Sequence, residues 1–182
     1  MLAPTSVPAV FLVDDDASVR KALTRLIKSA GHTVQAFASA NEFLAYWRDH
    51  DEVPGCLLLD VRLPGLSGLD LQRELSAANA LLPVIFITGH GDIPMSVKAM
   101  KEGAVDFLPK PIKENELLRA LEQALARAER EHGERLHIDD IKRRLENLTA
   151  REREVMTLVV RGLLNKQIAW ELGTGEKTVR VH

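Results

Sequence analysis

The chain has 182 residues, which allows one domain or a standard domain with a small second one. Hydrophobic residues make up 46% and charged residues 27%, which excludes a fibrous chain, and aromatic residues at 4% are too scarce for a platform that stacks single-stranded nucleic acid. The single cysteine, Cys56, excludes an internal disulfide and indicates a buried thiol in a reducing compartment. The sequence has no long apolar run and no signal-peptide pattern at its start, so we expect a cytoplasmic protein without a membrane partner.

The net charge of −2 hides an uneven distribution along the chain. Residues 1–141 carry 15 basic and 21 acidic side chains, whereas residues 142–182 carry 9 basic and 5 acidic ones. An acidic segment of net charge −6 therefore precedes a basic one of +4. A basic terminal segment is compatible with nucleic-acid binding, although a solvated charged helix would give the same composition.

Short apolar runs alternate with helical patterns from residue 8 to about residue 130. Residues 10–13, 56–59 and 84–87 are apolar on both faces, which is typical of strands buried in a parallel sheet, and 33–37 and 106–108 form two weaker strands. Helical periodicity covers 18–30, 41–48, 68–78 and 95–102, with start signals at Ser39, Ser67 and Asp92. This five-fold alternation predicts a doubly wound α/β domain with a five-stranded parallel sheet.

A long helix is predicted from about Glu114 through Glu146. A first heptad-like stripe consists of Leu118, Leu121, Leu125 and Ala128, and a second, one residue out of register, consists of Ile138, Ile141, Leu145 and Leu148. Two interpretations of the first stripe stay open: packing on the sheet, or pairing with a second copy of the chain. We expect a helical linker over residues 127–146.

A separate unit follows Leu148. Thr149 with Glu152 forms a capping box that starts a helix through Arg161, a short helix spans 165–171, and a third begins near Glu176. Helix, turn and helix within about 30 residues is the spacing of a helix-turn-helix motif. Its expected small core comprises Val155, Leu158, Val159, Leu163, Ile168, Ala169, Leu172 and Val179.

Polar residues follow four of the predicted strands. Asp14 and Asp15 come after the first, Asp60 after the third, Thr88 after the fourth and Lys110 after the fifth. In an open parallel sheet such residues meet at the carboxyl ends of the strands. Each Asp taken alone could serve only as a helix cap or turn residue. The combination predicts an all-oxygen Mg²⁺ site beside a carboxylate that acts as nucleophile toward a phosphoryl group.

Four stretches resemble the two-component response regulators: LVDDDASVRKAL, CLLLDVRLPGLSGLDL, VIFITGHGDIPMSVKAMKEGAVDFLPKP and LTAREREVMTLVVRGLLNKQIAWELGTGEKTVRVH. The segments ITGHGDIPM and RGLLNKQIA are similar to the FixJ group of FixJ/NarL-type transcription factors, which carry a LuxR-type helix-turn-helix. The resemblance implies a flavodoxin-like receiver with strand order 2-1-3-4-5 over residues 1–126, and a DNA-binding domain over 147–182.

The resemblance also implies roles for individual residues. Asp60 would accept a phosphoryl group from a sensor histidine kinase, with Mg²⁺, or Mn²⁺ or another divalent ion, held by Asp14, Asp15, Asp60 and the backbone carbonyl of Arg62. Lys110 would contact the phosphoryl oxygens and precede a cis proline, Pro111. Thr88 and Phe107 would form the switch that turns phosphorylation into a packing change.

The resemblance likewise makes the helix after Glu176 the recognition helix for double-stranded promoter DNA. Arg180 would contact guanine and Val181 a thymine methyl, while Lys166, Lys177 and Thr178 would bind phosphates. Family members continue beyond His182 and add a fourth helix, so we expect weak DNA binding by the chain as printed. A homodimer after phosphorylation is expected, and RNA polymerase is a further candidate partner.

Two other functions compete with a phosphorylation-controlled transcription factor that is not an enzyme. A Mg²⁺-dependent aspartyl phosphatase of the haloacid-dehalogenase type would carry its nucleophilic aspartate and a second acidic residue two positions apart. Here Arg62 stands two positions after Asp60, which argues against this function. A receiver that signals only through protein contacts is the other alternative, and DNA binding would distinguish it.

Overall fold

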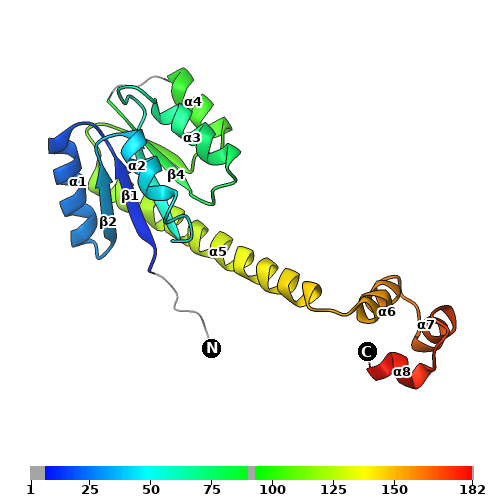
Figure 1. Cartoon of the computed structure of the whole chain (residues 1–182). Helices are drawn as coiled ribbons and strands as arrows, with labels where there is room; N and C mark the ends of the chain where they lie inside the picture. The colour runs from blue at the N-terminus through cyan, green and yellow to red at the C-terminus, as the bar shows by residue number, and fades with distance from the viewer. Residues whose placement is uncertain (1–6, 90–92, 182) are drawn as a thin grey trace. The chain divides into compact units, whose positions relative to one another are not determined.

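The computed structural model describes residues 7–89 and 93–181. The chain forms two compact units, Met1–Gly133 and Glu134–His182. Figure 1 shows the elements of each unit with their labels. The helix start predicted at Asp92 lies outside the described residues.

The first unit is built on a five-stranded parallel sheet in the order β2-β1-β3-β4-β5 (Figure 1). The strands are β1 (Ala9–Val13), β2 (Thr33–Phe37), β3 (Gly55–Asp60), β4 (Val84–Thr88) and β5 (Asp106–Pro109). The three central strands, β1, β3 and β4, are buried along their whole length, because helices cover both faces of the sheet. The predicted fold class and strand order are confirmed.

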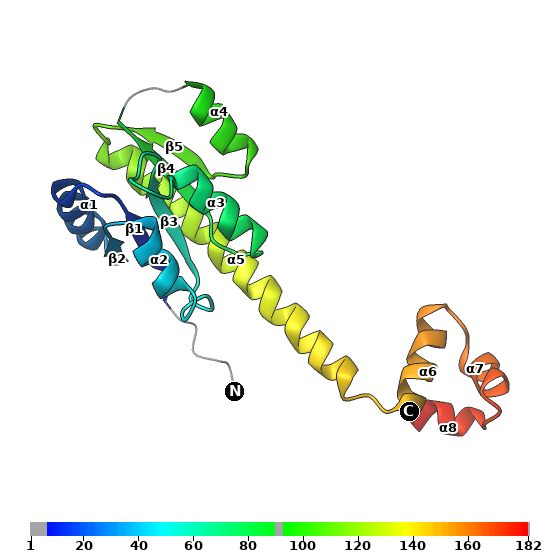
Figure 2. The ribbon, with the colours of Figure 1, turned by 45° about the horizontal axis from the view of Figure 1, so that its top comes forward.

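Helices pack on the sheet in two layers, as Figures 1 and 2 show. One face carries α1 (Ala17–Ser29) and the first part of α5 (Glu114–Glu146), and the other carries α2 (Ala40–Trp47), α3 (Gly68–Ala77) and α4 (Ile93–Lys101). Alternate strand residues supply the two cores: Phe11 and Phe86 face α2 and α3, whereas Leu12 and Ile85 face α1 and α5.

Polar caps begin the helices near the carboxyl ends of the strands. The Asp16 carboxylate accepts hydrogen bonds from the N–H groups of Ser18 and Val19 at the start of α1. Ser39 and Ser67 cap α2 and α3 as predicted. These caps fix where each helix leaves the edge of the sheet at which the acidic residues gather.

The two apolar stripes of α5 differ in burial. Leu121 and Leu125 of the first stripe are buried in the core beside the sheet, with Leu118 packed against them, and Ala128 is also buried. Local packing therefore explains that stripe. Leu117, which the heptad pattern missed, is also fully buried. The second stripe stays largely uncovered by described residues: Ile138 is 51%, Ile141 43% and Leu145 37% exposed.

The second unit contains α6 (Ala150–Val160), α7 (Asn165–Glu171) and α8 (Glu176–Val181). The predicted capping box is present, since the Thr149 side chain accepts from the Glu152 N–H while the Glu152 carboxylate accepts from the Thr149 N–H. Its core consists of Val155, Leu158, Ile168, Ala169 and Val179, with Leu163 and Leu172 half-buried beside them. The prediction for Val159 was wrong: it is 50% exposed, because it lies on the side of α6 away from α7 and α8.

None of the helices in the described part of the chain combines the length and apolar character needed to cross a bilayer.

Candidate functional site

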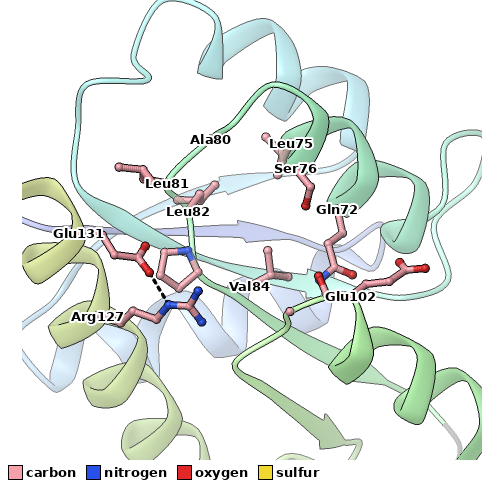
Figure 3. A pocket seen from close by; sticks show the side chains of 12 residues that line it. Gln72, Leu75, Ser76, Ala80, Leu81, Leu82, Val84, Glu102, Arg127 and Glu131 are labelled. Atoms are coloured by element: carbon pink, nitrogen blue, oxygen red, sulfur yellow. Dashed lines mark hydrogen bonds and ion pairs between the residues drawn. The ribbon is translucent and has the colours of Figure 1, made fainter. Parts of the chain in front are cut away.

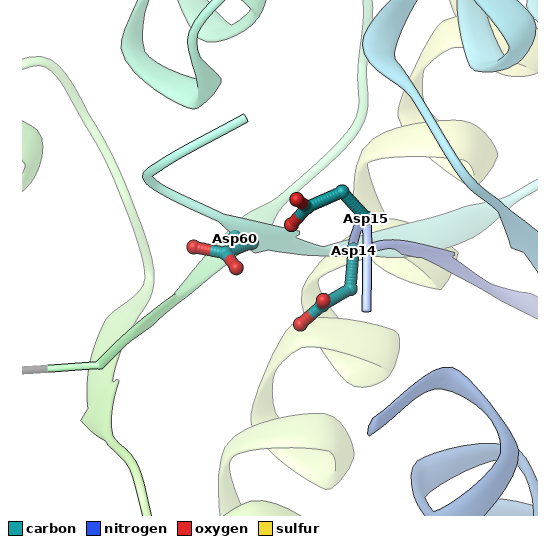
Figure 4. A group of neighbouring side chains, drawn as sticks. All are labelled: Asp14, Asp15 and Asp60. Atoms are coloured by element: carbon teal, nitrogen blue, oxygen red, sulfur yellow. The ribbon is translucent and has the colours of Figure 1, made fainter. Parts of the chain in front are cut away.

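Three carboxylates meet at the carboxyl ends of β1 and β3 (Figure 4). Asp14 and Asp15 directly follow β1, and Asp60 is the last residue of β3. One oxygen from each lies within 4.8 Å of the others. The chain crosses from one side of β1 to the other at this point, which opens the crevice where parallel α/β sheets bind ligands.

Asp14 is the fully buried member of this cluster. Burial raises the pKa of its carboxyl, and hydrogen bonds from Lys110 and the Asp16 N–H oppose that rise without cancelling it. The Asp16 N–H lies 2.8 Å from Oδ1, and Lys110 Nζ lies 2.9 Å from Oδ2. A buried carboxylate held in this way would gain from a further cation nearby.

Lys110 places a cation beside two of these carboxylates. Its Nζ donates to Oδ2 of Asp14 and, at 3.0 Å, to Oδ2 of Asp60. Burial alone would lower the pKa of Lys110, but the hydrogen bonds and charges of the two carboxylates outweigh burial and raise it. The ammonium group therefore stays charged. The peptide bond between Lys110 and Pro111 is cis, as predicted.

Asp60 is held by its own loop as well as by Lys110. Its side chain is 8% exposed, and its Oδ1 accepts the Arg62 N–H at 2.9 Å. Gly68, the first residue of α3, packs against the same turn, because its N–H donates to the Val61 carbonyl at 3.1 Å. A Cβ at position 68 would lie 2.4 Å from the Asp60 carbonyl oxygen, so only glycine fits there.

Arg20 is a site residue that sequence reasoning missed. From the first turn of α1, its Nη1 donates to the carbonyl oxygens of Asp14 at 2.7 Å and Asp15 at 2.9 Å. The guanidinium group thus fixes the backbone that carries the acidic pair. The only hint in the sequence is its spacing, six residues after Asp14 and on the first turn of the helix, and that spacing alone is not specific.

The two predicted switch residues lie on the neighbouring strands. Thr88 ends β4 and is buried, one residue beyond Ile87, which pairs with Asp60 in the sheet. Phe107 on β5 is half-buried and contacts the Phe86 ring with centroids 6.3 Å apart. Thr88 is therefore at the same edge of the sheet as the carboxylates, whereas Phe107 lies farther along β5 toward its start.

The donor set fits a hard divalent cation. Asp14, Asp15 and Asp60 offer only oxygen ligands, Asp15 is exposed to solvent, and Lys110 forms ion pairs with Asp14 and Asp60. Mg²⁺ prefers a few carboxylates together with retained waters, which this exposed edge allows. The neighbouring Asp16 is exposed and caps α1.

The predicted DNA contacts are all exposed on the second unit. Lys166 lies on α7, and Lys177, Thr178, Arg180 and Val181 lie on α8. Arg180 forms an ion pair with Glu176 one turn earlier, with Nη2 and Oε1 3.2 Å apart. Because Val179 points into the core, its neighbours on α8 face outward.

A doubly wound sheet with an acidic cluster and a lysine at its carboxyl edge, followed by a helix-turn-helix unit, is typical of regulators that join a receiver domain to a DNA-binding domain. The profile of the response regulator receiver domain matches residues 10–122. The profile of the bacterial regulatory proteins of the luxR family matches residues 146–182.

Known proteins are similar to this chain over nearly its whole length. Nodulation protein W of Bradyrhizobium diazoefficiens is 51% identical over 173 residues, covering 95% of this chain and 75% of its own length. The response regulator protein TodT of Pseudomonas putida is 47% identical, with the same coverage of both chains. The solved structure of the response regulator StyR superposes with a TM-score of 0.86 at 49% identity, covering 97% of this chain and 88% of that one.

The chain belongs to the response regulator family, in the group of transcription factors with a LuxR-type DNA-binding domain. Proteins of this family regulate transcription and are not classical enzymes. Receiver domains generally bind Mg²⁺ at an acidic pocket, and the two domains imply a sensor kinase and DNA as partners.

Proposed function

We propose that Asp60 is the phosphoacceptor of this regulator. The observation that carries the proposal is the geometry around its carboxylate: Oδ2 lies 3.0 Å from the Lys110 ammonium, with Asp14 and Asp15 beside it at the open edge of the sheet. An Asp60 oxygen attacks the phosphorus atom of a sensor histidine kinase's phosphohistidine, the P–N bond breaks, and the histidine leaves. Lys110 then balances the added charge on the phosphoryl oxygens.

The metal ligands proposed for this chain are Asp14, Asp15, Asp60 and the backbone carbonyl of Arg62. Mg²⁺ is the preferred ion because every ligand is an oxygen, and Mn²⁺ is the alternative with similar requirements. When bound, the ion supplies positive charge next to the transferring phosphoryl group. Asp14 contributes a carboxylate in a fixed position, since the Asp16 N–H and Lys110 both hold it.

Thr88 and Phe107 are the proposed switch. The Thr88 side chain would turn toward the phosphoryl group, and Phe107 would move into the space that this motion opens next to Phe86. The support is their placement on β4 and β5, between the carboxylate edge and the surface formed by α4 and β5. This change would release the DNA-binding unit or promote a homodimer.

The proposed domain organisation is a receiver over 1–126, a helical linker over 127–146 and a DNA-binding domain over 147–182. Lys166, Lys177 and Thr178 would contact phosphates of promoter DNA, and Arg180 and Val181 would contact bases. RNA polymerase is a further proposed partner. Since both a kinase's phosphohistidine and the promoter are reached in the cytoplasm, we place the protein there.

The test is intact mass spectrometry after incubation with acetyl phosphate, with and without Mg²⁺. We expect a gain of one phosphoryl group that requires Mg²⁺ and disappears in Asp60→Asn. Asp51→Asn is the matched control, because it makes the same change at an exposed site outside the cluster. A phosphoryl group that persists in Asp60→Asn, or that does not form in the parent chain, would contradict the assignment.

A further inference from the structure

Helix α5 changes its surroundings near Gly133. Ala128 is the last buried residue of the helix. Arg127 Nε and Glu131 Oε1 form an ion pair of 2.6 Å beside the cavity that α5 shares with α3 and the start of β4 (Figure 3). Gly133 ends the first compact unit, so the remaining turns of the helix, through Glu146, belong to the second. The proposed phosphorylation chemistry uses none of the side chains in these turns.

The second stripe gives these turns an uncovered apolar face. Ile138, Ile141 and Leu145 are spaced by three and four residues, so they project from one side of the helix, and each is between 37% and 51% exposed. The core of the second unit, as far as the structure describes it, includes none of them. Arg153 Nη2 donates to the carbonyl oxygens of Leu145 at 3.3 Å and Glu146 at 3.2 Å, which holds the last turn of the helix. This spacing of exposed apolar residues is the pattern by which a helix docks on another protein.

Basic side chains border the apolar face on both sides. Arg135 and Lys142 lie along one side, and His137 and Arg144 lie along the other, since each pair is seven residues, or about two turns, apart. All four side chains are exposed. Arg144 pairs with Asp140 at 2.9 Å, but its side chain is 79% exposed, and such a surface ion pair is weak enough to exchange for another.

Most acidic side chains of these turns lie on the opposite side of the helix. Asp139, Asp140 and Glu146 are there, together with the exposed Leu136. Glu134, at the start of the apolar face, is the exception. The helix therefore presents an apolar face with basic borders, and a partner that complements it has acidic side chains around an apolar centre.

The basic borders argue against a second copy of the chain as the occupant. In a parallel pair of helices, His137 of one copy would face Lys142 of the other across the seam. In an antiparallel pair, each basic border would face the same border of the second copy. A membrane surface is also a poor match, because the apolar face is narrow and residues 134–146 contain no aromatic side chain.

We propose that Ile138, Ile141 and Leu145 dock on a partner protein through an apolar helix face that is bordered by acidic side chains. The apolar residues pack against those of the partner. Carboxylates of the partner pair with Arg135 and Lys142 on one side and with the opposite basic border on the other. The apolar contacts supply the buried area, and the charges select the partner and its orientation.

The test uses the full ¹⁵N-labelled chain, without metal or phosphodonor, titrated with a synthetic peptide and followed by two-dimensional NMR. The peptide has three heptads with Leu at positions a and d and Glu at e and g, and its own glutamates keep it from pairing with itself. We expect saturable shifts in residues 134–148. A peptide with Lys in place of each Glu should bind about 5-fold more weakly or less. The result is independent of the assignment of Asp60.

Matched variants identify the face. Leu145→Gln removes an apolar contact, and Leu136→Gln makes the same change on the opposite side of the helix. Lys142→Glu reverses a border charge, and Arg143→Glu reverses a charge on the opposite side. We expect Leu145→Gln and Lys142→Glu each to weaken binding of the Glu peptide about 5-fold and the two controls to leave it unchanged. Lys142→Glu should also strengthen binding of the Lys peptide, which a merely structural effect would not do.

Three NMR results would overturn the proposal: no saturable shifts, equal binding of the two peptides, or parent-like binding by Leu145→Gln. Sedimentation of the chain alone tests the second copy, since a dimer that Leu145→Gln dissociates would mean that the face pairs with itself. Flotation with phosphatidylglycerol vesicles tests the membrane, and binding that Leu145→Gln abolishes would likewise refute a protein partner. All four substituted side chains are exposed, and the dispersion of each spectrum shows that the variant is folded.

Discussion

The ammonium group of Lys110 lies 3.0 Å from Oδ2 of Asp60 and 2.9 Å from Oδ2 of Asp14, and so links the ends of β1 and β3. One lysine thereby compensates two carboxylates that would otherwise repel each other. The same contact would place a positive charge next to a phosphoryl group on Asp60. Stability and function are thus coupled at this residue, and the first prediction follows from that coupling.

Lys110→Ala should lower the free energy of unfolding of the receiver by about 3 kcal/mol, because it leaves the buried Asp14 carboxylate without its cation. Mg²⁺ should stabilise this variant more than the parent. The measurement is urea unfolding followed by Trp47 fluorescence in a Trp170→Phe background, which removes the exposed second tryptophan. Lys113→Ala, at a lysine that is 73% exposed, should change stability by less than about 0.5 kcal/mol. Equal effects of the two substitutions would refute the argument.

Arg20→Ala should weaken Mg²⁺ binding about 10-fold although the three carboxylates are kept, because the loss of residues that orient metal ligands typically lowers metal affinity 10–100-fold. The reason is that Arg20 holds the carbonyl groups of Asp14 and Asp15. Calorimetric titration with Mg²⁺ measures the effect. Arg25→Ala on the exposed part of the same helix is the control, and a similar loss there would show that only net charge matters.

Cys56 predicts a specific dependence of stability on pH. Burial raises the pKa of its thiol to about 12 in the folded protein, against 9.0 for the reference thiol. Between these values the folded state keeps a proton that the unfolded state loses, so the free energy of unfolding falls as pH rises. From pH 8 to pH 10 this thiol should account for a loss of about 1.4 kcal/mol.

The measurement compares the parent with Cys56→Ala by urea unfolding at both pH values. Other groups titrate in this range, but they do so in both proteins. The stability difference between parent and variant should therefore shrink by about 1.4 kcal/mol at pH 10. A constant difference would show that the thiol ionises at the same pH in both states.

The second unit yields a prediction on salt dependence. Lys177→Ala should reduce the slope of log affinity against log salt by about 0.9 for a random-sequence DNA duplex, because one phosphate contact is lost. Fluorescence anisotropy at several salt concentrations measures the slope. Lys101→Ala removes the same charge from α4 of the receiver and should leave the slope unchanged. If neither lysine alters the slope, α8 does not contact the DNA backbone.

The sheet and its helices were predictable because their signals are local. Continuous apolar runs such as Cys56 to Leu59 indicate strands buried on both faces, and Ser39, Ser67 and Thr149 mark helix starts. The strand order was not derivable from these patterns and came from the family resemblance. The acidic cluster was predictable in outline, since residues after parallel strands meet at one edge.

The sequence did not predict several contacts and burial states of individual side chains. Arg20 binds backbone carbonyl groups, which leave no mark in the side-chain pattern. The buried Leu117 was missed because a strict heptad marks a narrower stripe than the face that α5 buries on a broad sheet. Val159 was assigned to the core because it is apolar, although a three-helix unit this small covers only one side of α6.

The close contact between position 68 and the Asp60 carbonyl has a consequence for genetic screens. Random mutagenesis that selects for loss of signalling should return substitutions at Gly68 alongside changes to the carboxylates, although Gly68 carries no reactive group. Any side chain there must displace the last residue of β3, and with it the carboxylate that the strand presents. Their defect would appear in the rate of phosphorylation.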